Sequence, residues 1–170
     1  MPKMSRTLLY TSIALFLAIH IVLINRIEIC GAKPDILLSL VVFIGLFFGS
    51  GAGFEAGIAA GFGKDIFAFD YFGTNAFILG LVGIIVGAVN TKIFRESGLT
   101  RMLLVFFFCS FGMYSRVLLS RFVFRSGSPN FAEYTLFSVF PVSAYSSLAA
   151  LPVFGYLIHV FGLKELPDIV

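Results

Sequence analysis

The sequence predicts an all-α integral membrane protein, folded as a single transmembrane domain over residues 1–170. Hydrophobic residues make up 59% of the chain and charged residues only 12%, and the mean hydropathy is +1.01. A soluble domain is about half apolar and about a quarter charged. Six helical spans of about 20 residues each would use roughly 120 residues and leave short connections. The sequence therefore predicts a compact bundle of six transmembrane helices, with no soluble catalytic domain and no enzyme activity.

The first two spans are predicted at residues 8–24 and 36–48. No small-residue cleavage site follows the first apolar run, so we expect an uncleaved span rather than a signal peptide. The second run begins after Pro34, which ends any preceding helix, and Asp35, which can cap the next one. Its 13 residues reach only about 20 Å, less than the hydrocarbon core of about 30 Å. The second span is therefore expected to be short or broken.

A tight reversal at residues 49–51, which include two glycines, leads into a third span at residues 52–69. This span carries charged residues, so it too is expected to be short or broken. The fourth span, residues 73–91, is almost wholly apolar and has Thr74 or Asn75 as its expected N-cap.

The fifth and sixth spans are predicted at residues 102–124 and 135–161. The sixth is long enough to cross a bilayer, although Pro141 and Pro152 should kink it. These two segments complete the predicted bundle of six helices.

Basic residues near the span ends predict the orientation. With a cytoplasmic amino terminus, the inner side holds Lys3, Arg6, Lys92, Arg95, Arg101 and Lys164, and the outer side holds Arg26, Lys33, Arg121 and Arg125. The short connection between the fourth and fifth spans carries three of the inner charges. We therefore expect both termini in the cytoplasm.

The third span carries Gly53, Gly57 and Gly61 at every fourth position, here called the glycine row. Rows of small residues let helix backbones approach closely inside a membrane. One interpretation is packing within this chain, with the glycines at positions 80, 83 and 87 of the fourth span as partners. The other is a face that binds a different protein.

Asp65 continues the glycine row by one turn and so faces the same neighbour. A carboxylate at the centre of a membrane helix costs about 2.5–3.5 kcal/mol on insertion scales, so a partner is expected. Arg116 lies at a matching depth of about 20 Å on the fifth span. We hypothesise an Asp65–Arg116 ion pair that fixes the register of these helices. The alternative is that Arg116 extends outward and Asp65 is hydrated. Lys64 is expected to reach the outer interface.

Metal, cofactor and nucleic-acid sites are not predicted. His20 and His159 lie on different spans near opposite membrane faces, and no nucleophile stands at the spacing of a catalytic triad. Cys30 and Cys109 sit in or beside apolar stretches, which is typical of core filling. The net charge of +3 is too small to indicate a nucleic-acid partner.

Three motifs together resemble the bacterial rod shape-determining protein MreD family, most clearly over residues 33–95. They are Lys33-Pro34-Asp35 before an apolar stretch, then Gly53-x3-Gly57-x3-Gly61-x3-Asp65, then Phe72-Gly73-Thr74-Asn75-Ala76 before a glycine-rich span. The resemblance implies a multi-pass protein of the bacterial inner membrane, in the rod complex (elongasome) that supports peptidoglycan synthesis and cell shape. It also implies a fold similar to the substrate-binding components of energy-coupling-factor transporters.

The partners implied by the resemblance are the scaffold MreC and, directly or indirectly, the actin-like filament protein, RodA and its transpeptidase. On this hypothesis the chain binds the single span of MreC on a small-residue face and shifts the complex towards its active arrangement. The partner-binding or helix-packing residues would be Gly53, Gly57, Gly61 and Asp65, with Asp35 and Arg116 supporting the helix arrangement.

The alternative function is a substrate-binding subunit of a vitamin-type transporter. Ala14 and Ala18 form a small-residue pair on the first span, similar to the pair with which such subunits dock their energising partner. A solute pocket would need polar groups that converge on the outer side, and the outer connections offer few of them, such as Arg26, Glu28, Asn75 and Glu133.

Overall fold

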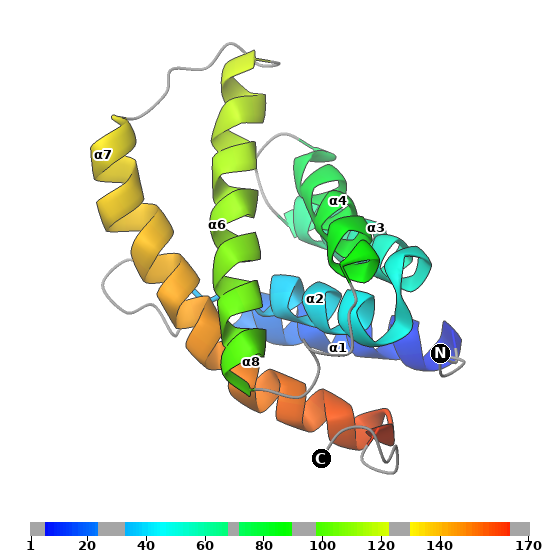
Figure 1. The fold of residues 1–170 in the computed structure, drawn as a ribbon. Coiled ribbons are helices and arrows are strands. Elements are labelled where there is room, and N and C mark those ends of the chain that lie inside the picture. Colours follow the sequence, from blue (N-terminus) through cyan, green and yellow to red (C-terminus); the bar gives the residue numbers. More distant parts are fainter. Residues whose placement is uncertain (1–5, 24–32, 68–71, 90–97, 123–129, 164–170) are drawn as a thin grey trace.

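The computed structural model describes residues 6–23, 33–67, 72–89, 98–122 and 130–163, and these residues form helices and no strand. Figure 1 shows how the helices are arranged. In chain order they are α1 (Arg6–Leu23), α2 (Ile36–Phe48), α3 (Ser50–Phe67), α4 (Thr74–Ala88), α6 (Gly98–Phe122), the short α7 (Phe131–Tyr134), the π-helix η1 (Thr135–Val139) and α8 (Phe140–Val160).

The all-helical class agrees with the sequence prediction, and each predicted span contains a helix. The second, 36–48, has the predicted bounds, whereas the third and fifth helices begin earlier, at Ser50 and Gly98, and the fourth ends earlier, at Ala88.

Within the described ranges, two helices are long and apolar enough to cross a membrane, Gly98–Phe122 and Thr135–Val160. The apolar parts of α1, α2 and α4 are shorter. The six-span bundle therefore stays a prediction, and so does the orientation, because most of its basic residues lie outside the described residues.

Helix α2 is the centre of the bundle. It contacts α1, α3, α4, α6 and α8, and every residue from Leu37 to Phe47 is buried. Phe43 packs edge-on against Phe154 of α8, with 5.3 Å between the ring centroids. Because protein surrounds α2 on all sides, its 13 residues need not match the thickness of a bilayer. This accounts for its shortness without a break in the helix.

Helices α3 and α4 make the most extensive contact in the structure and lie side by side in Figure 1. The chain reverses from α2 into α3 at Gly49, whose φ of 92° is a conformation that other residues rarely adopt. The glycine row lies directly against the backbone of α4. A Cβ atom added at Gly57 would lie 2.3 Å from the carbonyl oxygen of Leu79, and one added at Gly61 would lie 2.3 Å from Cα of Ala76.

Helices α6, η1 and α8 form the other side of the bundle. The chain from α7 through η1 to α8 is one curved helical run (Figure 1). The π-helical turn ends two residues before Pro141, and Pro152 lies inside α8. A proline removes one backbone hydrogen bond and crowds the preceding turn, and π-helical turns are a recognised way to absorb such a disturbance.

Candidate functional site

Asp65, at the end of α3, binds the start of α4. Its carboxylate accepts hydrogen bonds from the backbone N–H groups of Gly73 (3.0 Å), Asn75 (3.1 Å) and Ala76 (3.1 Å), and from the side-chain amide of Asn75 (2.7 Å). Asp65 as a whole is 3% exposed. The first N–H groups of a helix have no partner within the helix and carry its positive dipole end, which favours an anion. Asp65 is thus the cap of α4, supplied by a neighbouring helix.

This arrangement corrects two sequence predictions. The first turn of α4 is capped by Asp65 rather than by Thr74 or Asn75, and its N-cap residue, Gly73, has no side chain. Asp65 also makes no ion pair with Arg116 in the described part of the chain. Instead a guanidinium N–H of Arg116 donates to the side-chain oxygen of Asn75, whose amide nitrogen donates to Asp65. The side-chain amide of Asn75 thus lies between the two charges.

A double charge exchange is the test of this corrected arrangement. Asp65→Arg and Arg116→Asp should each destabilise the protein, and the double variant should recover none of the lost free energy of unfolding. The reason is that an arginine at position 65 cannot accept the three backbone N–H bonds of α4. Recovery in the double variant, measured by a double-mutant cycle, would mean that a direct pair exists after all.

Lys64 forms an ion pair with Asp35, with 2.5 Å between Nζ and Oδ2. The two side chains are only 16% and 17% exposed, so Lys64 is directed at Asp35, and its expected position at the outer interface stays a prediction. Burial acts to raise the pKa of the Asp35 carboxyl, but the Lys64 ammonium and the N–H of Leu38 outweigh it and hold that pKa below its ordinary value. Asp35 is therefore ionised at neutral pH.

Asp35 also organises the start of α2. Its carboxylate accepts a hydrogen bond from the N–H of Leu38 at 3.1 Å, which confirms the predicted cap. Its own N–H donates to the hydroxyl of Ser146 on α8 at 2.9 Å. Asp35 thus connects the beginning of α2 with the first half of α8 and with the end of α3.

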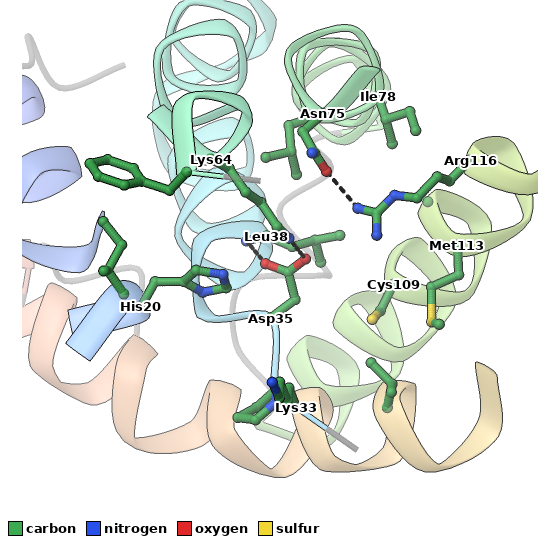
Figure 2. A pocket seen from close by; sticks show the side chains of 16 residues that line it. His20, Lys33, Asp35, Leu38, Lys64, Asn75, Ile78, Cys109, Met113 and Arg116 are labelled. Carbon is green, nitrogen blue, oxygen red and sulfur yellow. Dashed lines mark hydrogen bonds and ion pairs between the residues drawn. The ribbon is translucent and has the colours of Figure 1, made fainter. Parts of the chain in front are cut away.

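Asp35, Lys64, Asn75 and Arg116 line a cavity of about 470 Å³. Figure 2 shows Asp35 between His20 and Lys64, and Arg116 extending from α6 towards Asn75. The cavity lies where the end of α1, the starts of α2 and α4, the end of α3 and the second half of α6 come together. In the predicted orientation this is the outer end of the bundle.

The predicted site residues have two different roles in this structure. Gly53, Gly57 and Gly61 lie against α4 and away from the cavity. These contacts agree with the first interpretation of the glycine row, packing within this chain, because α4 lies against that face. Asp65 does not line the cavity but accepts a hydrogen bond from Asn75, which does. Asp35 and Arg116 line the cavity directly.

Sequence reasoning missed Lys64 as part of the site, and it considered Asn75 only as a helix cap or as one of a few polar groups for a solute pocket. Both stood inside the motifs, Lys64 next to Asp65 and Asn75 in the run from Phe72 to Ala76. A usable signal was present, because a buried carboxylate at the end of one helix and free N–H groups at the start of the next are natural partners. The position of Lys64 could not be read in the same way, since its partner lies 29 residues earlier in the chain.

Comparison with protein families gives one match that covers nearly the whole chain. The family model described as rod shape-determining protein MreD matches residues 2–162 of the 170. Neither the curated proteins nor the solved structures contain a match to the chain. The expected likeness to components of energy-coupling-factor transporters therefore stays a prediction.

Proposed function

The chain belongs to the MreD family of rod shape-determining proteins, and we propose that it acts as a non-enzymatic assembly protein of the rod complex. In this role it binds the scaffold MreC and helps to organise peptidoglycan synthesis during elongation. The actin-like filament protein, RodA and its transpeptidase are direct or indirect partners. The protein crosses the bacterial inner membrane several times, with both termini in the cytoplasm. The family match over residues 2–162 is the observation that carries this proposal.

The structure supports a mechanism in which the chain acts as a rigid helix bundle that binds partners rather than as a catalyst. Its central helix α2 is buried, and the glycines of α3 lie directly against backbone atoms of α4. A partner helix is therefore accommodated on an outer helix face. Binding there stabilises one arrangement of the complex through differential affinity, which is population shift.

Co-purification with the scaffold tests the proposal. MreC should be retained on the detergent-solubilised, tagged protein, and replacing the single MreC span by an unrelated span of equal length should remove most of the retained scaffold. A single-span membrane protein from outside the rod complex serves as the control for unspecific retention. Absence of MreC from the purified protein, or equal retention with the foreign span, would contradict the proposal.

The alternative, a substrate-binding subunit of a vitamin-type transporter, has one specific observation in its favour. Ala14 and Ala18 lie exposed on α1, where they are accessible to another helix. If this function holds, the energising subunits of a transporter should co-purify instead of MreC, and Ala14→Leu with Ala18→Leu should abolish their retention.

A further inference from the structure

The cavity at the outer end of the bundle has the dimensions of a small-molecule site. Its volume of about 470 Å³ falls within the roughly 300–1,000 Å³ that ligand pockets occupy. Such pockets are mostly apolar with a few polar groups that orient the ligand. Apolar side chains from at least five helices form much of its wall, among them Leu38, Phe67, Ile78, Leu79, Met113 and Val142.

Arg116 supplies a positive charge to this cavity that no carboxylate of the described residues neutralises. Within the described residues it forms no ion pair, and its single hydrogen bond goes to the neutral amide of Asn75. Its Nε is buried and has no acceptor among them. The Asp35 carboxylate, which also lines the cavity, is paired with Lys64. A guanidinium that lines a largely apolar cavity and uses only one of its five N–H groups on the described residues is matched by an anionic oxygen.

The arginine is also held in position. Asp65 fixes the amide of Asn75 through its nitrogen, so the amide oxygen is directed at Arg116. Because Asp65 is tied in turn to three backbone N–H groups of α4, the chain of contacts reaches back to a helix end. A guanidinium oriented before a ligand arrives loses less conformational entropy when the ligand binds.

We propose that this cavity binds an amphipathic anion, whose carboxylate or phosphate accepts from Arg116 and whose apolar part lies against Leu38, Ile78 and Val142. The binding site goes beyond the assembly role and does not depend on it. The same chemistry is present in an anionic lipid headgroup and in a water-soluble acid with an apolar body.

Four soluble probes test the site on the purified full chain in a nonionic detergent. They are dihexanoyl phosphatidylglycerol, its zwitterionic counterpart dihexanoyl phosphatidylcholine, hexanoate and inorganic phosphate. Dissociation constants are obtained from the rise in thermal stability with probe concentration. At least one probe that joins an anionic group to an apolar body should bind about tenfold or more tightly than phosphatidylcholine and than phosphate alone. Binding of phosphatidylglycerol alone identifies a lipid headgroup as the ligand source, and binding of hexanoate identifies a free acid.

Variants on α6 assign the binding to this cavity. Arg116→Gln should weaken binding of the favoured probe about tenfold or more, whereas Arg121→Gln, which removes an exposed charge five residues further along the same helix, should change it less than about twofold. Gly112→Leu keeps the charge but directs a side chain towards Ile78 and Leu38. It should weaken binding while size-exclusion behaviour stays normal. Equal binding of the charged and zwitterionic lipids, no binding of any anionic amphiphile, or unchanged binding in both Arg116→Gln and Gly112→Leu would overturn the proposal.

Discussion

Replacing Gly57 with alanine is expected to lower the free energy of unfolding by about 3 kcal/mol or more, a large effect for a single methyl group. The added Cβ would lie 2.3 Å from the carbonyl oxygen of Leu79 and 2.7 Å from the backbone nitrogen of Gly80. Backbone cannot rotate away as a flexible side chain does, so α3 and α4 must separate. The loss is measured by unfolding the purified protein in mixed micelles without any partner.

Gly51 provides a matched control on the same helix. A Cβ atom there meets nothing within 4 Å, so Gly51→Ala should leave stability unchanged or raise it by up to about 1 kcal/mol through helix propensity. The comparison separates internal packing from partner binding, because the chain is studied alone. Equal stability of the two variants would mean that the glycine row is not an internal contact.

Replacing Asp65 with alanine is the second change with a large expected effect. It leaves the N–H groups of Gly73, Asn75 and Ala76 and the amide of Asn75 without their acceptor. Each buried donor without a partner costs about 1–3 kcal/mol, so the free energy of unfolding should fall by more than about 3 kcal/mol. Asp65→Asn keeps one acceptor oxygen and should lose less.

Glu55→Ala is the control for removing a carboxylate from α3. Glu55 accepts only from the exposed hydroxyl of Tyr10 among the described residues, so its loss should cost less than about 1 kcal/mol. A stability of Asp65→Ala close to that of Glu55→Ala would contradict the capping role of Asp65. The three variants are compared by the same unfolding measurement.

The positions of the helices could be predicted from the sequence, because apolar runs, glycines and prolines determine where a helix begins and ends through their immediate neighbours. The bounds of α2 and the cap at Asp35 needed only the residues next to them. Gly83 and Gly87 were correctly expected to face the third helix, since rows of small residues indicate close backbone contact. The glycine row could not by itself show whether its partner was internal, because the pattern is the same in both cases.

The contacts of the charged residues were less accessible, since they depend on how each helix is rotated about its axis. Counting residues gave Asp65 and Arg116 equal depth, but depth carries no information about direction around the bundle. Asn75 lies between them because α4 starts there. Likewise Lys64 bends towards Asp35 because α2 begins beside the end of α3, a contact that only the tertiary fold creates.

An experimental structure of the full chain in a lipid nanodisc tests the central claim most directly, namely that α3 and α4 are joined through the glycine row and through Asp65. The account predicts Gly57 against the backbone of Leu79 and the Asp65 carboxylate on the N–H groups of Gly73, Asn75 and Ala76. Acyl chains or a foreign helix between α3 and α4, with Asp65 turned away from the start of α4, would contradict it.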